Sequence, residues 1–167
     1  GYAAVMEGFR NLGFMGGIAV PAVVRFGAGF LYGAGVAATE LGVTIDVTNY
    51  EYLGTFAPSD DVKSKAASWY TTGTEIIFVA AGGAGNSVMA AAQEATNKYV
   101  IGVDIDQASQ SPTVITSAMK ALGVVVQQAL QDYVDGTFEG GETLTLGAAE
   151  NAVALPGGDS FRFTVFT

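Results

Sequence analysis

Residues 75–107, EIIFVAAGGAGNSVMAAAQEATNKYVIGVDIDQ, decide the fold. This stretch predicts a buried strand over 75–80, a glycine-rich turn, a helix over 87–96 and a second strand over 99–103 with an acid after it. A strand, a helix and another strand in this order are typical of a parallel sheet. We therefore expect an α/β protein whose ligands meet the carboxyl ends of its strands.

The flanking segments continue the alternation of strands and helices. We expect further strands over 12–15, 43–52, 113–117 and 143–146, and further helices over 21–41, 59–72 and 119–134. Pro21 suits a first helical turn, Gly42 suits a helix stop, and Ser59 or Asp60 suits an N-cap. The predicted architecture is a three-layer sandwich: a parallel sheet of five or six strands with helices on both faces.

An apolar stripe at helical spacing marks the last predicted helix, over 119–134. Its members are Leu122, Val126, Leu130 and Tyr133. Such a stripe predicts a helix with one face for packing.

Composition excludes several classes of function. The chain has 167 residues, a net charge of −9 and 14% charged residues, so it is long enough for one folded domain and lacks the basic surface that nucleic acids require. It has no cysteine and no histidine, which excludes thiol catalysis, imidazole bases and thiolate or imidazole metal sites. We expect no metal and no cofactor. Apolar runs such as 18–24 are too short to cross a bilayer, so no membrane segment is expected.

The glycine turn at 82–85 partly matches the dinucleotide fingerprint G-x-G-x-x-G. Gly83 and Gly85 occupy the first two glycine positions, Val88 replaces the third, and Asp104 or Asp106 supplies the acid expected about 20 residues later. Three interpretations remain open: a sharp turn alone, a ligand close to the backbone, or a bound pyrophosphate.

Loops after the other predicted strands reach the same edge of the sheet. They bring small residues, hydroxyls, the carboxylate of Asp104, the amine of Lys120 and the ring of Phe56. Such a set can bind a hydroxylated ligand through Asp104 and Lys120 and cover an apolar ring with Phe56. The alternative is that Asp104 and Lys120 only neutralise each other as an ion pair.

Motifs spread over most of the chain resemble one known family. GFMGG at 13–17, AAGG at 80–83, GVDIDQ at 102–107 and TSAMK at 116–120 resemble the basic membrane protein family, the PnrA-like substrate-binding lipoproteins of ABC importers. The resemblance implies a type I periplasmic-binding-protein fold, in which two α/β lobes hold a purine nucleoside between them. It divides the chain into the end of an N-terminal-lobe helix and crossover at 1–12, the C-terminal ligand-binding lobe at 13–155 and a crossover tail at 156–167.

The resemblance also implies roles for individual residues. Asp104 is expected to accept hydrogen bonds from ribose hydroxyls, and Lys120 to donate to the ligand or to Asp104. Gly82 and Gly83 would let the backbone approach the ligand, and Phe56 would be an aromatic wall or, alternatively, a buried loop anchor. The loop residues Asp106 and Gln107 are expected to brace the loop, while Trp69 and Tyr70 are expected to pack.

The function implied by the resemblance is binding, not catalysis. The full-length protein would be lipid-anchored outside the cytoplasm and would pass its ligand to ABC permease subunits. The chain begins at Gly1 without a methionine or a signal sequence, which favours a fragment of a longer protein. Alternatives are a domain of the same fold that senses a sugar, a flavin or another metabolite, and an NAD-binding oxidoreductase fragment.

Overall fold

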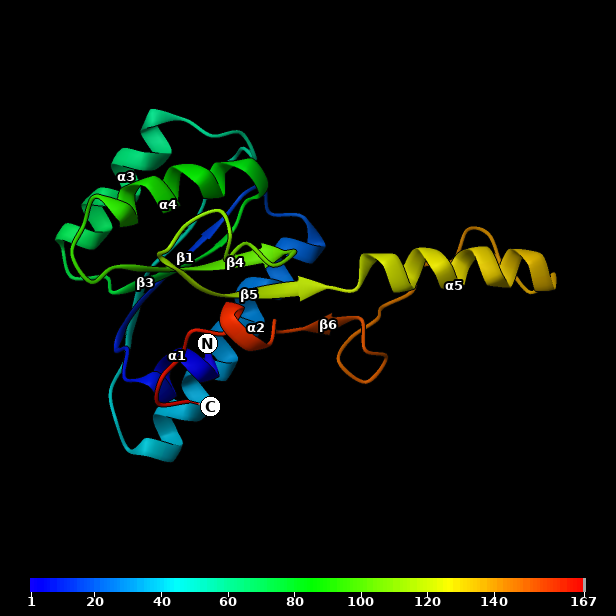
Figure 1. Cartoon of the computed structure of the whole chain (residues 1–167), viewed down its shortest axis with the longest axis horizontal. Coiled ribbons are helices and arrows are strands. Elements are labelled where there is room, and N and C mark those ends of the chain that lie inside the picture. The colour runs from blue at the N-terminus through cyan, green and yellow to red at the C-terminus, as the bar shows by residue number, and fades with distance from the viewer. Residues whose placement is uncertain (167) are drawn as a thin grey trace.

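A computed structural model describes residues 1–166 as a six-stranded sheet in the order β2-β1-β3-β4-β5-β6. In chain order the elements are α1 (Tyr2–Glu7), β1 (Asn11–Gly16), α2 (Pro21–Leu41), β2 (Asp46–Tyr52), α3 (Asp60–Thr71), β3 (Ile76–Ala80), the 3₁₀ turn η1 (Gly82–Ala84), α4 (Gly85–Gln93), β4 (Tyr99–Asp104), β5 (Val114–Lys120), α5 (Leu122–Asp135), β6 (Val153–Ala154) and the 3₁₀ turn η2 (Gly158–Ser160). Helices α1 and α2 cover one face of the sheet and α3 and α4 the other (Figure 1). The predicted three-layer α/β fold is confirmed.

Local sequence signals place the ends of two helices. Helix α2 starts with Pro21 in its first turn and ends at Gly42, whose φ of 64° is left-handed. Helix α3 starts after Ser59, whose hydroxyl oxygen accepts a hydrogen bond from the Val62 N–H at 3.3 Å. These caps satisfy backbone groups that the helix itself leaves unpaired, which is why they could be predicted.

The prediction for the last strand is wrong. Residues 143–146 are irregular, and the sixth strand is instead β6, two residues long. It runs antiparallel to β5, with Met119 opposite Ala154 and Lys120 opposite Val153, so the sheet is not parallel throughout. A strand this short carries no alternation of apolar and polar residues, and its position depends on the path of the chain after α5.

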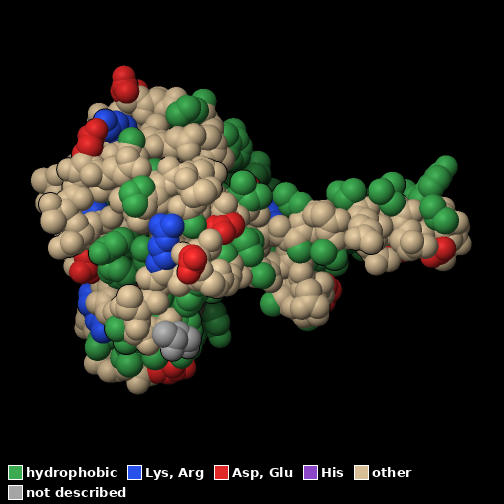
Figure 2. Space-filling model, viewed as in Figure 1, with side chains coloured by type: hydrophobic (Ala, Val, Ile, Leu, Met, Phe, Trp, Pro, Cys, Tyr) green, Lys and Arg blue, Asp and Glu red, His purple; other side chains and the backbone are tan. Residues whose placement is uncertain are grey.

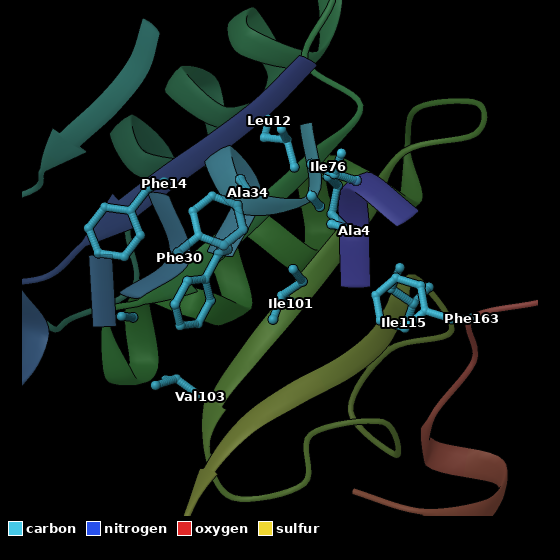
Figure 3. Close-up of a cluster of buried hydrophobic side chains, with 14 of the residues drawn as sticks. Ala4, Leu12, Phe14, Phe30, Ala34, Ile76, Ile101, Val103, Ile115 and Phe163 are labelled. Atoms are coloured by element: carbon cyan, nitrogen blue, oxygen red, sulfur yellow. The ribbon is translucent and has the colours of Figure 1, made fainter. Parts of the chain in front are cut away.

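Two apolar clusters hold the layers together. The first lies between the sheet and α1–α2 and includes Phe14 and Phe30 (Figure 3). The second lies between the sheet and α3–α4. Tyr70 is 3% exposed in the second cluster and donates its hydroxyl to the carbonyl of Tyr99 at 2.9 Å, while Trp69 packs at its edge. Both residues therefore pack, as predicted.

Helix α2 changes the expectation about membrane segments. By length and composition alone, residues 21–41 could cross a bilayer, although no single apolar run in the sequence indicated it. Along this helix, however, Val23, Phe30 and Ala34 are buried in the first cluster. Core helices of globular proteins can be equally long and apolar, and these buried residues indicate a core helix.

Helix α5 extends away from the layered body (Figure 1). None of its residues is buried, and the predicted stripe is open: Leu122 is 52%, Val126 60%, Leu130 62% and Tyr133 74% exposed. Figure 2 shows apolar side chains along this projection. The prediction of a helix with an apolar stripe is confirmed, but within residues 1–166 nothing covers that stripe.

The tail after η2 returns to the body. Phe163 is 6% exposed and belongs to the first cluster. Arg162 donates hydrogen bonds to backbone carbonyls of the loop before β5 and of β5 itself, among them Ala108 at 3.2 Å and Val114 at 3.0 Å. The Glu7 carboxylate accepts hydrogen bonds from the N–H groups of Thr164, Val165 and Phe166 and from the Thr164 hydroxyl, at 2.7–3.0 Å. The tail is therefore attached at both α1 and β5.

The Glu7 contacts predict a dependence of stability on pH. Desolvation alone would raise the pKa of Glu7, but hydrogen bonds from Phe166, Thr164 and Val165 outweigh it and lower the pKa from 4.5 to about 2. Because the folded pKa lies below the unfolded one, the stabilisation is fully present above pH 4.5 and is lost as the pH falls toward 2. We expect Glu7→Gln to lower the free energy of unfolding by about 1 kcal/mol at neutral pH and to flatten its pH dependence below 4.5. Urea titrations at several pH values measure both effects. If the free energy of unfolding fell as steeply at acidic pH in Glu7→Gln as in the wild type, the role of Glu7 would be contradicted.

Candidate ligand-binding site

The parallel strands β1 to β5 end at one edge of the sheet, where all the predicted site residues lie. Gly16 at the end of β1 pairs with Ala80 at the end of β3, and Asp104 at the end of β4 pairs with Met119, next to Lys120. The loops that follow these strands form a rim. Its two parts are Phe56, Gly82 and Gly83 beside β1 and β3, and Asp104 and Lys120 beside β4 and β5.

Asp104 and Lys120 form an ion pair at this rim. Lys120 Nζ lies 2.7 Å from Asp104 Oδ1, and the two side chains are 31% and 43% exposed. Asp104 Oδ1 nevertheless has no hydrogen bond of good geometry, so the ammonium group meets it off the hydrogen-bonding direction. An exposed pair of this kind contributes little to stability. Oδ1 is itself shielded from solvent, so the acceptor capacity that Asp104 offers a hydroxyl donor is that of its other carboxylate oxygen.

Phe26 is a neighbour of Lys120 that the sequence analysis did not assign to the site. Lys120 Nζ lies 5.0 Å from the centre of the Phe26 ring, within range of a cation–π contact. Phe26 also meets Phe78 edge-on at 5.9 Å between ring centres. It belongs to the apolar stripe of α2, and only the tertiary packing of α2 against β1 and β3 brings it to Lys120. No local sequence signal identifies it.

Phe56 anchors its loop, although it is not buried, and its role as an aromatic wall for a ligand stays a prediction. Its backbone carbonyl accepts the Ala84 N–H at 2.9 Å, and its ring lies over Gly17, where a Cβ atom would come within 2.3 Å of it. The residue is 39% exposed. It is thus a loop anchor whose ring still reaches solvent at the rim.

The glycines of η1 lie directly beneath the Phe56 loop. Gly82 has a φ of 53°, a left-handed value that strains other residues. A Cβ atom on Gly83 would lie 3.2 Å from the Phe56 carbonyl oxygen. Both glycines therefore suit a sharp turn against the Phe56 loop, and the approach of their backbone to a ligand stays a prediction.

Two loop residues behave as expected. Asp106 Oδ1 accepts the Ala108 N–H at 3.0 Å, and hydrogen bonds from the Ser160 hydroxyl and this N–H lower the pKa of Asp106. Gln107 is 9% exposed; its side-chain oxygen accepts the Val103 N–H of β4, and its own N–H donates to Ser117 Oγ of β5. Both residues brace the loop that follows Asp104. Among residues 1–166, no group of three or more carboxylates gathers closely enough to hold a metal ion.

A hollow of about 730 Å³ lies on the α2 side of the sheet and shares only Lys120 with the rim. Apolar side chains of α1, α2, β5 and the start of α5 line most of it. It includes Lys120 and Phe26 but not Asp104, Gly82, Gly83 or Phe56. A hydroxylated ligand suits the rim better, whereas this hollow is an apolar surface continuous with the base of α5.

The fold is that of a class of proteins that includes the solute-binding proteins of ABC transporters. A solute-binding protein of an ABC transporter from Aeropyrum pernix has a TM-score of 0.76 and 28% identity over 92% of this chain and 43% of its own. A dimeric Lac repressor has a TM-score of 0.54 at 16% identity, which shows the same fold alone. This is the periplasmic-binding-protein type of fold.

Within that class, the chain belongs to the family of PnrA-like ABC transporter substrate-binding proteins, which matches residues 1–166. The CD4+ T-cell-stimulating antigen of Listeria monocytogenes is 34% identical over 87% of this chain and 44% of its own length. Basic membrane protein D of Borreliella burgdorferi is 35% identical over 87% and 42%. The ABC transporter nucleoside-binding protein BmpA of Lactococcus lactis is 30% identical over 87% and 45%. The predicted family is confirmed, and the chain spans less than half the length of these relatives.

The family consists of substrate-binding proteins, not enzymes. The oxidoreductase alternative is therefore set aside. The replacement of the third fingerprint glycine by Val88, whose side chain is fully buried beneath the sheet, agrees with this conclusion.

Proposed function

We propose that this chain is one ligand-binding lobe of an extracytoplasmic receptor that delivers a purine nucleoside to an ABC importer. The observation that carries the proposal is the Asp104–Lys120 pair at the carboxyl ends of neighbouring parallel strands, in a member of a substrate-binding family. Ligands of open α/β sheets bind outside this edge. The nucleoside-binding name of the Lactococcus lactis relative supports the choice of ligand.

The proposed chemistry follows from the acceptor capacity of Asp104. A ribose hydroxyl donates to the carboxylate, while Lys120 donates to Asp104 or to the ligand. Once a second lobe closes over the rim, an unpaired Asp104 would cost about 1–3 kcal/mol, so a ligand with hydroxyls is favoured over one without. Phe56 supplies an apolar surface for the base at the other end of the rim.

Helix α5 is proposed to pack against the second lobe of the full-length receptor. Its exposed stripe is far too apolar for a free helix, and the chain leaves this body at Lys120 and returns at β6. Solute-binding proteins of the matched class are about twice as long as this chain. We therefore place 121–152 against the second lobe, rather than within the ligand-binding lobe at 13–155, and keep the tail at 161–166 with the present body.

The cellular setting is proposed from the family. Substrate-binding proteins of ABC transporters work with permease subunits, and the relatives called basic membrane proteins point to an extracytoplasmic, lipid-anchored receptor. The closed form of the two lobes would be the form that the permease recognises.

Calorimetry of the full-length protein tests the proposed function. We expect micromolar or tighter binding of a purine ribonucleoside, and binding weaker by about tenfold or more for its 2′,3′-dideoxy analogue. Ribose, a pyrimidine ribonucleoside and riboflavin are titrated in parallel, because a sugar or flavin sensor is the alternative. Preferred binding of ribose or riboflavin would replace the nucleoside proposal, and equal affinity for the dideoxy analogue would remove hydroxyl recognition from it.

A further inference from the structure

Asp104 sits in an unusual backbone conformation. Its φ is 67°, in the left-handed region, although it is not glycine. The Ile105 N–H donates to the Val103 carbonyl at 2.8 Å, which closes a three-residue turn around Asp104. A γ-turn with positive φ is rare and strained, so it persists only where neighbouring contacts enforce it.

The contacts that enforce this turn come from Gln107. Pairing between β3 and β4 stops at Phe78 and Ile101, so Val103 has no ladder partner on that side. Gln107 Oε1 takes the place of the strand and accepts the Val103 N–H at 2.9 Å. Both backbone groups of Val103, the residue before Asp104, are thus paired: its N–H with Gln107 Oε1 and its carbonyl with the Ile105 N–H.

Gln107 is itself fixed to the neighbouring strand. Its N–H donates to Ser117 Oγ at 3.0 Å, and Ser117 is fully buried on β5. Gly102, opposite Ser117, makes room for this arrangement: a Cβ atom there would lie 2.6 Å from Gln107 Oε1 and 2.7 Å from Ser117 Oγ. The loop is therefore tied to the same strand that carries Lys120.

We propose that Gln107 is a positioning residue that holds the Asp104 turn, so that the carboxylate faces Lys120 and the ligand hydroxyls. This inference rests on the proposed function for its ligand. Gln107 does not touch the ligand; it acts through Val103 and the turn. Its role is separate from packing, because the Gln107 amide replaces a missing backbone partner rather than filling an apolar space.

The test compares Gln107→Met with Gln110→Ala in the full-length receptor. Gln107→Met keeps the side-chain length and removes the acceptor for Val103, whereas Gln110→Ala removes only the outer partner of the Gln107 amide. We expect Gln107→Met to weaken binding of a purine ribonucleoside about tenfold and binding of the 2′,3′-dideoxy analogue less than about twofold. Gln110→Ala should change neither. In an Asp104→Ala background, Gln107→Met should have no further effect on binding.

Two outcomes of the binding measurements would overturn the inference. Equal loss of affinity for both ligands would mean a structural role alone, as would loss of affinity in the Asp104→Ala background. A crystal structure of the Gln107→Met variant provides a test that needs no ligand: Asp104 should leave the left-handed region and its contact with Lys120. If Asp104 stays in place there, the inference fails. The wild-type receptor could bind the ribonucleoside and the dideoxy analogue equally well while Asp104 leaves the left-handed region in the variant. That result would contradict the proposed ligand and support the positioning role of Gln107.

Discussion

Asp104→Ala is expected to weaken binding of a purine ribonucleoside by the full-length receptor about 100-fold. The substitution removes a charged acceptor from ligand hydroxyls in a closed cleft, a loss of about 1.5–3 kcal/mol. It also releases Lys120, whose ammonium lies 2.7 Å from the carboxylate. Affinity for the 2′,3′-dideoxy analogue should change by less than about threefold, because that ligand has no hydroxyl donors for Asp104. Isothermal titration calorimetry measures both.

A matched control comes from the same loop. Asp106→Asn removes the same charge two residues away, but Asp106 accepts hydrogen bonds from Ala108 and Ser160 rather than facing the rim. We expect its affinity for the ribonucleoside to stay within about threefold of wild type. Equal losses from both substitutions would mean that general negative charge, and not the Asp104 carboxylate, attracts the ligand.

Phe14→Ala is expected to destabilise the fold by about 3–5 kcal/mol. Phe14 is 1% exposed in the centre of the first cluster, where its ring stacks on Tyr50 at 4.6 Å and meets Phe78 edge-on at 5.6 Å (Figure 3). Truncation leaves a cavity between the sheet and α2 that these rings cannot close. Chemical denaturation should show a lower midpoint with an unchanged slope.

The control for Phe14 is a phenylalanine outside the body. Phe138, which follows α5, is 54% exposed, so Phe138→Ala should change stability by less than about 0.5 kcal/mol in this chain. In the full-length receptor the same substitution should cost more if 121–152 packs against the second lobe. A negligible effect in both proteins would contradict that placement.

Most of the body could be predicted because its signals are local. The buried run at 76–80 predicts a central strand. Pro21 and Ser59 mark the starts of two helices, and Gly42 marks an end, because each suits the unpaired backbone groups at a helix terminus. The parallel order then places the residues at the end of each strand at one edge, and so predicts that Asp104 and Lys120 lie together.

The remaining features depend on contacts between distant segments. Phe26 meets Lys120 only because α2 packs against β1 and β3, and Phe56 lies over Gly82 and Gly83, with its carbonyl bound to the Ala84 N–H. Strand β6 and the exposure of α5 depend on where the chain goes after Lys120. An apolar stripe predicts that a helix packs, but not what it packs against.

A crystal structure of the full-length receptor with a purine ribonucleoside tests the central claim most directly. The account predicts the nucleoside at the rim between two lobes, with ribose hydroxyl oxygens about 2.5–3.0 Å from the Asp104 carboxylate. A nucleoside bound elsewhere, with Asp104 still turned only toward Lys120, would contradict it.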